Sequence, residues 1–172
     1  EKHIERYSNS FPDISFLAKQ TAQQAEDIQN IISGLREKNS VLVLNNTTIL
    51  HRSYYEKLKK NATVILNEYH QSNPLRLGMI KEEFKSKLLP KTSGKAGDAL
   101  LELLESDEVI KNLGKYIASF DFEITFNPIQ LKIKELVENA FLNKPYATPK
   151  VEEVMNSISY KNQDIEQVFE VM

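Results

Sequence analysis

The chain of 172 residues contains no cysteine and no tryptophan, and only three histidines, five glycines and six prolines. Without cysteine it can form no disulfide, no thiolate zinc site and no cysteine nucleophile. His3, His51 and His70 offer no i,i+4 pair for a metal, so no metal site is expected. No apolar run approaches the roughly 18 residues that span a bilayer, and no basic-then-apolar leader is present. We therefore expect a cytoplasmic protein without a membrane partner.

Charge is unevenly distributed although the formal net charge is only −2. Residues 51–100 contain 10 Lys or Arg against 5 Asp or Glu, whereas residues 101–172 contain 7 against 13. A basic middle region suits a phosphate backbone or an acidic partner, and a solvated charged surface is the alternative. The candidate contacts are the basic side chains of this region: Lys57, Lys59, Lys60, Arg76, Lys81, Lys85, Lys87, Lys91 and Lys95.

The first part of the chain has the order helix, turn, helix, hairpin. In AEDIQNIISGLREK the apolar residues follow the spacing of one helical face, with Ile28, Ile31, Ile32 and Leu35. A shorter helix, DISFLAKQT, precedes it with Asp13 as the predicted N-cap. VLVLNNTTIL follows as a predicted hairpin, because Asn45 and Asn46 tolerate the positive φ of a tight two-residue turn. This order is typical of a winged helix.

The same order recurs in the middle of the chain. SYYEKLKKNATVILNEYH places one apolar face on a helix, with Tyr54, Leu58, Ala62, Ile65, Leu66 and Tyr69. After an Asn-Pro turn, MIKEEFKSKLL and DALLELLESDE predict two more helices. VIKNLGKYIAS then predicts a closing hairpin with Gly114 in its turn.

A third copy is predicted to begin at Asn127-Pro128, where asparagine caps a helix and proline takes its first position. Thr148-Pro149 repeats this device, and Glu152 and Glu153 fall near the positive end of that helix. The two outer helices of this copy would bury Ile129, Ile133, Leu136, Val137 and Ala140, and Ile165, Val168, Phe169 and Met172. No hairpin follows, and the chain does not begin with methionine, so we expect a fragment.

The predicted fold class is mainly α with small β-hairpins, arranged as tandem winged-helix domains. The predicted domains are residues 1–51, residues 52–122 and residues 123–172, the third lacking its wing. Units of this size have thin individual cores, so we expect them to pack on one another.

Residues suited to catalysis are not found. TSGKAGD lacks the pattern of a phosphate-binding P-loop, because Leu89 and Ala96 stand where glycine and Ser or Thr are needed. The adjacent glutamates at 82–83 and 152–153 point about 100° apart on a helix and favour compensation of the helix dipole. His70 ends a helix, where imidazole commonly contacts carbonyl groups, and no acid or serine is placed to partner it. No enzyme activity is predicted.

The third helix of the middle copy disfavours standard DNA reading. Glu102, Glu105 and Asp107 occupy it, whereas a major-groove reader presents Arg, Lys, Asn or Gln. Contact with a nucleic-acid backbone or ribosomal RNA, or a role in solubility, remain open for the basic residues.

The stretch EYHQSNPLRLGMIKEEFKSKL resembles a motif of the selenocysteine-specific translation elongation factors, SelB. The shared features are a helix ending in an aromatic-His pair, then Asn-Pro-Leu-Arg, Gly-Met and a Lys-Glu-Glu helix. The flanks are also similar: FPDISFLAKQTAQQAEDIQNIISGL to the first winged helix of that family's C-terminal arm, LHRSYYEKLKK to the start of the second, and NPIQLKIKELVENAF with YATPKVEEV to the third.

This resemblance implies a function in protein biosynthesis. The family has a GTP-binding part that uses GTP and magnesium and carries selenocysteinyl-tRNA, followed by tandem winged helices that bind the selenocysteine insertion hairpin of mRNA at the ribosome. In bacterial members the last winged helix holds the hairpin. This chain has no GTPase motif, so the resemblance implies a non-catalytic, RNA-directed arm without a cofactor of its own. The alternatives are a DNA-binding transcriptional regulator and a winged-helix scaffold for protein interactions.

Overall fold

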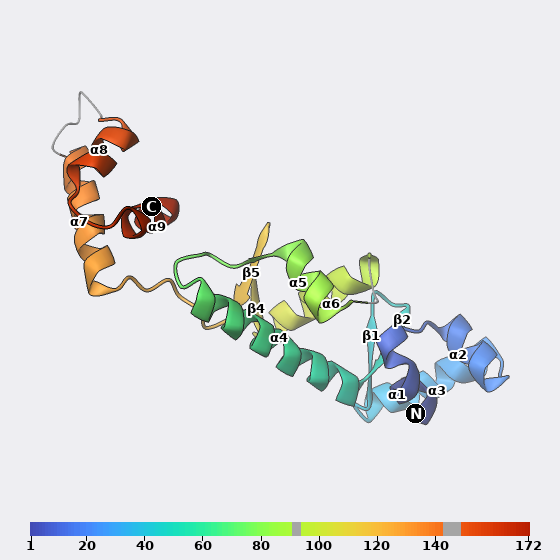
Figure 1. Ribbon diagram of the computed structural model, residues 1–172. Coiled ribbons are helices and arrows are strands. Elements are labelled where there is room, and N and C mark those ends of the chain that lie inside the picture. The colour runs from blue at the N-terminus through green and yellow to red at the C-terminus, as the bar shows by residue number, and fades with distance from the viewer. Residues whose placement is uncertain (91–93, 143–148) are drawn as a thin grey trace. The chain divides into compact units, whose positions relative to one another are not determined.

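The computed structural model describes residues 1–90, 94–142 and 149–172 (Figure 1). The predicted contact Lys91 and the predicted cap Thr148 lie outside these residues. The chain divides into two compact units, a larger unit of residues 1–69 and 78–121 and a smaller unit of residues 70–77 and 122–172. Helices dominate both, and the β structure consists of small antiparallel pairings within the larger unit. The predicted fold class, mainly α with winged-helix domains, is confirmed.

The first elements of the larger unit are α1 Lys2–Tyr7, η1 Ser8–Ser10, α2 Ile14–Thr21, α3 Ala25–Glu37, β1 Val41–Leu44 and β2 Thr48–His51. The predicted cap of α2 is confirmed, because Asp13 Oδ1 accepts a hydrogen bond from the Phe16 backbone N–H at 2.6 Å. Ile28 and Ile32 of α3 are buried, but Ile31 is 43% exposed, so the predicted core face of this helix was too wide.

The first hairpin differs from the predicted two-residue turn by one residue. Leu44 pairs with Thr48, so three residues form the loop between β1 and β2. Asn45 (φ 48°) and Asn46 (φ 58°) both adopt the left-handed conformation that their side chains tolerate. The predicted conformation of the two asparagines is therefore confirmed, and only the predicted loop length was wrong.

The second set of elements is α4 Arg52–Ser72, β3 Met79–Ile80, α5 Lys81–Leu88, α6 Lys95–Ser106, β4 Ile110–Leu113 and β5 Tyr116–Ser119. The three strands form one antiparallel sheet in the order β3-β5-β4. Sequence reasoning assigned Met79 and Ile80 to helix, which is wrong, since they pair with Ile117 and Tyr116. The residue before them is Gly78, and glycine is needed at this position because a Cβ there would collide with the Ile117 carbonyl group.

Tyr55, rather than the predicted Tyr54, is the fully buried tyrosine of α4. Its hydroxyl donates a hydrogen bond to Asp107 Oδ2 at 2.9 Å and so satisfies the polar end of a buried ring. Tyr54 is partly buried and packs edge-on against Phe11, with ring centroids 6.4 Å apart.

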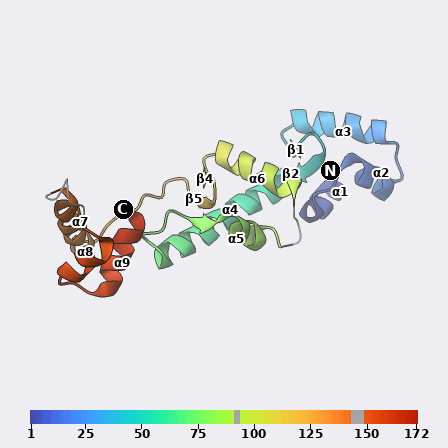
Figure 2. The ribbon, with the colours of Figure 1, turned by 90° about the horizontal axis from the view of Figure 1, so that it is seen from above.

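The first hairpin shares a hydrophobic core with the second set of elements. Phe11, Leu44 and Leu50 belong to the same buried cluster as Tyr55, Leu58 and the core leucines of α6. Asn45 Nδ2 adds a hydrogen bond to the Lys95 carbonyl oxygen at 2.9 Å. Both ribbon views show β1 and β2 between α1–α3 and the helices α4 and α6 (Figures 1 and 2). These contacts make the two sets of elements one compact unit.

The smaller unit contains α7 Pro128–Leu142, α8 Val151–Ser157 and α9 Asn162–Val171. Asn127 caps α7 as predicted, since its Oδ1 accepts hydrogen bonds from the N–H groups of Ile129 and Gln130, both at 2.9 Å. The core consists of Ile133, Val137, Val154, Ile158, Ile165 and Val168. Three residues predicted to be buried, Ile129, Leu136 and Met172, are instead 49%, 45% and 53% exposed.

Candidate nucleic-acid interface

The helix that precedes each hairpin in a winged helix is the usual reader of nucleic acid. In α6 the outward positions hold Glu102 and Glu105, both exposed. In α3 the first turn exposes Glu26 and Asp27, and Arg36 is the helix's one basic residue. The last helix of the smaller unit, α9, has no Lys or Arg in its sequence. Negative potential on these helices opposes entry into a groove lined by phosphates.

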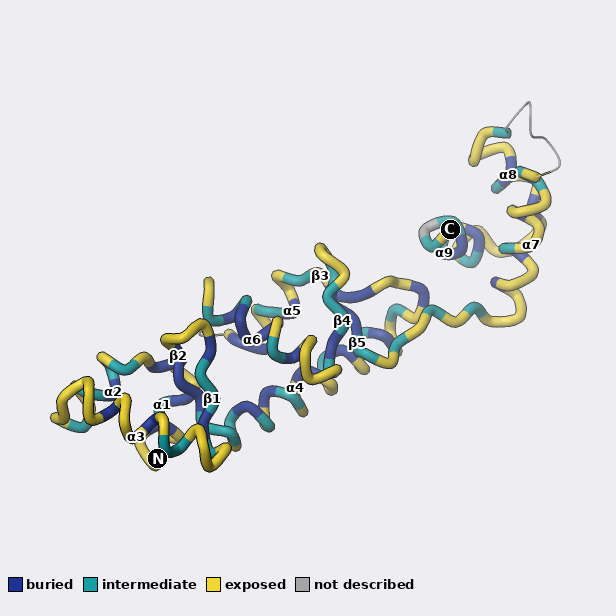
Figure 3. The backbone as a smooth tube through the Cα atoms, turned by 180° about the vertical axis from the view of Figure 1, so that it is seen from behind, coloured by how far each residue is buried: buried dark blue, intermediate teal, exposed yellow. Residues whose placement is uncertain are grey.

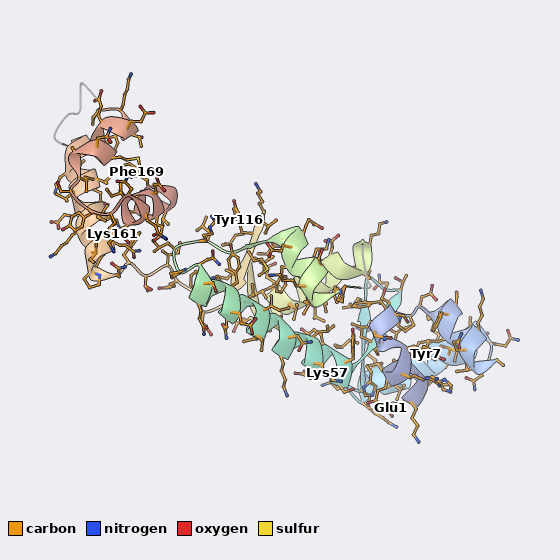
Figure 4. All side chains as sticks on the ribbon, in the orientation of Figure 1. Glu1, Tyr7, Lys57, Tyr116, Lys161 and Phe169 are labelled. Carbon is orange, nitrogen blue, oxygen red and sulfur yellow. The ribbon has the colours of Figure 1, made fainter. Side chains whose placement is uncertain are left out.

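The predicted contacts on α4 are not equivalent. Lys57 and Lys60 are exposed, and neither forms an ion pair with any residue that the structure describes. Figure 4 labels Lys57 on this helix. Lys59, in contrast, is bound to Asp107 Oδ2 at 3.1 Å and lies 5.6 Å from the centre of the Tyr55 ring. Lys59 therefore fastens α4 to the end of α6.

Asp107 receives two hydrogen bonds at this point. Burial raises the pKa of its carboxyl, but the hydrogen bonds from Tyr55 and Lys59 outweigh burial, and the net pKa is lowered. Burial and the same carboxylate raise the pKa of Tyr55. The acid that was expected to repel nucleic acid from this helix thus also has a structural role.

The lysines of α5 are mostly paired. Lys85 is only 12% exposed and contacts Asp98 at 2.9 Å and Glu82 at 3.5 Å. The hydrogen bond with Asp98 raises the pKa of Lys85 and lowers the pKa of Asp98. Lys87 pairs with Glu83 one helical turn away at 3.0 Å, and the nearby charge of Lys81 also lowers the pKa of Asp98. These pairs cancel much of the predicted positive field.

Two further candidates are exposed. Lys95 starts α6, and its carbonyl oxygen accepts the hydrogen bond from Asn45. Arg76 belongs to the smaller unit, where it lines a hollow with Gln163 and Gln167 of α9. His70, close to this turn, is buried and stacks on Phe122 with ring centroids 3.5 Å apart, and burial lowers its pKa. Its position is that of a packing residue.

The second hairpin carries cationic residues that sequence reasoning missed. Lys115 Nζ lies 5.9 Å from the centre of the Tyr116 ring, and Lys111 Nζ lies 5.9 Å from the centre of the Phe120 ring. These distances are those of cation–π contacts. The signal was present as KNLGKY, two lysines on either side of a glycine turn, but only the strand register shows which side chains share a face.

Within the described ranges, no cluster of three or more histidines, aspartates or glutamates is arranged to hold a metal ion. The helices in those ranges are also too short or too polar to cross a membrane.

The order of α4, β3, α5, α6, β4 and β5, with its three-stranded sheet, defines a winged helix. Residues 64–118 match the family model described as "Elongation factor SelB, winged helix". The match begins within α4 and ends within β5, so it covers the Asn-Pro turn, both following helices and most of the sheet. No curated protein matches the chain.

Proposed function

We propose that this chain is part of the non-catalytic winged-helix arm of a selenocysteine-specific elongation factor. The arm links the part that binds GTP and tRNA to the selenocysteine insertion hairpin of mRNA during UGA recoding. The match of residues 64–118 to the SelB winged-helix model is the observation that carries the proposal. That model bears the name of a second winged helix, which fits the middle position of residues 52–122 in this chain.

The shared core supports a spacing role. An arm that sets the distance between two bound partners must resist bending between its parts. Phe11, Leu44 and Leu50 are each at most 9% exposed in a cluster that also contains Leu100 and Leu104 of α6. Separating the first hairpin from α6 would expose these apolar side chains to water, at about 25 cal/mol per Å² of apolar surface. The larger unit is therefore suited to act as one rigid body.

The acidic helices support the same role. A factor that found its target through α6 would carry basic or amide side chains at the outward positions of that helix. In this chain those positions hold Glu102 and Glu105, whereas α3 exposes Glu26 and Asp27 together with Gln29, Asn30 and Arg36. Such helices suit an arm whose principal RNA contact is made elsewhere.

In this proposal the partners and cofactors are divided among parts of the factor. A further winged helix holds the mRNA hairpin, and the GTPase part binds GTP, magnesium and selenocysteinyl-tRNA. The arm works beside the ribosome in the cytoplasm. No nucleotide chemistry is assigned to residues 1–172.

The test compares binding of the chain to ribosomes, to a selenocysteine insertion hairpin and to duplex DNA over a range of salt concentrations. The proposal expects weak, salt-dependent binding to ribosomes or RNA and no preference for duplex DNA, since few lysines are available. Tight, sequence-selective binding to duplex DNA would contradict the proposal and favour a transcriptional regulator. The absence of any nucleic-acid or ribosome binding at low salt would exclude RNA contact by these residues and leave either an arm that only spaces or a protein-interaction scaffold.

A further inference from the structure

The outward face of the three-stranded sheet β3-β5-β4 combines apolar, aromatic and cationic groups. Tyr116 pairs with Ile80 on one side and with Leu113 on the other, so these three side chains form a row across β3, β5 and β4. Met79 and Ile117, one residue along, point the opposite way and are 1% and 0% exposed. The row therefore faces away from the core.

The row is accessible and apolar. Ile80 is 47% exposed and Leu113 is 46% exposed, and Tyr116 is partly exposed between them. Figure 4 labels Tyr116 on this hairpin. Two large aliphatic side chains and a tyrosine ring therefore lie side by side and are accessible to water. Contiguous exposed apolar groups of this kind are typical of a binding surface.

Within the hairpin itself the charges have one sign, and the neighbouring acids belong to α5 and α6, where Glu82 and Glu83 follow Ile80 and Glu105 Oε1 accepts a hydrogen bond from the Asn112 N–H at 3.3 Å. The hairpin from Val109 to Phe120 contains Lys111 and Lys115 and no Asp or Glu. Lys111 is two residues from Leu113 and shares its face, and Lys115 Nζ lies 5.9 Å from the Tyr116 ring centre. The Lys81 backbone N–H donates to the Lys115 carbonyl oxygen at 2.9 Å, which fixes the start of α5 beside the turn. An anionic ligand is thus favoured at this hairpin.

We infer that this face, formed by Ile80, Lys111, Leu113, Lys115 and Tyr116, binds single-stranded RNA. Bases stack on the tyrosine ring and on the aliphatic row, while the lysines contact the flanking phosphates. Small sheets with an exposed aromatic residue bind unstacked bases in this way, and the stacking tolerates any base sequence. The choice of RNA over other single strands rests on the proposed function. None of these five residues is among the basic contacts predicted from the sequence.

The experiment measures fluorescence anisotropy of a short, unstructured, labelled oligouridine titrated with the whole chain at several salt concentrations. The double substitution K111Q/K115Q is expected to weaken binding by roughly tenfold. It should also reduce the slope of log K against log salt by about 1.4, because each single-strand phosphate contact contributes about 0.7. The matched control K2Q/K19Q removes the same charge from exposed positions of α1 and α2, which are not among the candidate contacts, and should change affinity less than about twofold, with little change in slope.

The stacking contribution is tested separately at Tyr116. Tyr116→Phe retains the ring and should bind as the parent chain does, whereas Tyr116→Leu retains apolar bulk and should lose about fivefold or more. Thermal unfolding of each variant checks that the hairpin is intact. Equal losses for the two double substitutions, or no difference between the two Tyr116 variants, would overturn the inference. Equally effective competition by polyglutamate would also overturn it, since a peptide has no bases to stack.

Failure of this inference is distinguishable from failure of the proposed function. A chain that does not bind oligouridine can still space the two ends of the factor, which a UGA-recoding assay detects independently. Loss of the recoding role together with intact, Tyr116-dependent oligouridine binding would remove the proposed function and leave a single-strand binding face.

Discussion

The two hairpins of the larger unit have strands of equal length but opposite uses of their side chains. β1 and β2 contain no Lys, Arg, Asp or Glu, and Val41, Leu44, Ile49 and Leu50 are at most 5% exposed. Figure 3 shows these strands as buried or intermediate. β4 and β5 bury Ile110 and Ile117 on one face but expose Leu113 on the other, with the half-buried Lys111 and the exposed Lys115 on or beside that face.

This difference teaches that the hairpin of a winged helix can serve either as packing or as a contact surface. The first hairpin contains no Lys, Arg, Asp or Glu and packs against α4 and α6 through Leu44, Leu50 and Asn45. The second keeps an open, cationic face. Charge content within a hairpin therefore indicates its role more directly than its place in the fold.

The largest expected effect comes from an identical leucine truncation in each hairpin. Leu50→Ala removes a fully buried side chain from the shared core and should lower the free energy of unfolding by about 2–5 kcal/mol. Leu113→Ala removes a side chain that is 46% exposed and should cost less than about 1 kcal/mol. Urea unfolding followed by circular dichroism measures both. Equal costs would mean that the first hairpin is not a packing element.

A smaller effect is expected from exchanging the turn residues. Asn45→Gly keeps the positive φ but removes the hydrogen bond to the Lys95 carbonyl oxygen, so it should cost about 0.5–1.5 kcal/mol. Gly114→Asn, at φ 74° with no atom within 4 Å of the added Cβ, should be close to neutral because asparagine tolerates this conformation. Thermal unfolding compares them. A larger loss at Gly114 than at Asn45 would reverse the proposed roles of the two turns.

The lysines can be divided by the same kind of comparison. Lys85→Gln breaks the ion pair with Asp98 and should cost about 0.5–1 kcal/mol. K57Q/K60Q changes two exposed side chains without an ion pair among the described residues and should stay within about 0.5 kcal/mol. Chemical unfolding at low salt resolves the difference. If Lys85→Gln is neutral, this lysine returns to the set available for RNA.

Acid should lower the free energy of unfolding of the larger unit through two carboxylates, Asp98 in α6 and Asp107 at its end, rather than through either hairpin. The hydrogen bond from Lys85 lowers the pKa of Asp98, and hydrogen bonds from Tyr55 and Lys59 outweigh burial to lower that of Asp107. Their stabilisation is present above the unfolded-state pKa of about 3.9 and is lost as pH falls through the lower folded values. Unfolding of the parent, D98N and D107N chains at a series of pH values tests this. A difference between parent and variants that persists unchanged below about pH 2 would contradict it.

Much of the helical framework was predictable from local rules. The caps at Asp13 and Asn127 and the turn at Gly114 each depend on one residue type in one local conformation, and all three were found. The apolar faces were less accurate, because periodicity identifies a helical stripe but not which neighbour covers it. Ile31 and Leu136 lie on the predicted stripes and remain exposed.

The candidate site was harder to predict because it depends on contacts distant in sequence. Lys59 and Lys85 are basic in sequence, yet Asp107 and Asp98 neutralise them across helix boundaries. β3 has two residues, which is too short for any periodic pattern in the sequence. Without this strand, the position of Ile80 beside Tyr116 could not be predicted. The acid-free stretch around Gly114 was the one local signal available.

The most direct test of the central claim is a UGA-recoding assay in a reconstituted translation system. The proposed elongation factor is compared with a variant in which residues 1–172 are replaced by a flexible linker of sufficient reach. The account predicts that recoding falls sharply while GTP hydrolysis and selenocysteinyl-tRNA binding are retained, because a flexible linker no longer fixes the spacing. Undiminished recoding by the linker variant would contradict the account.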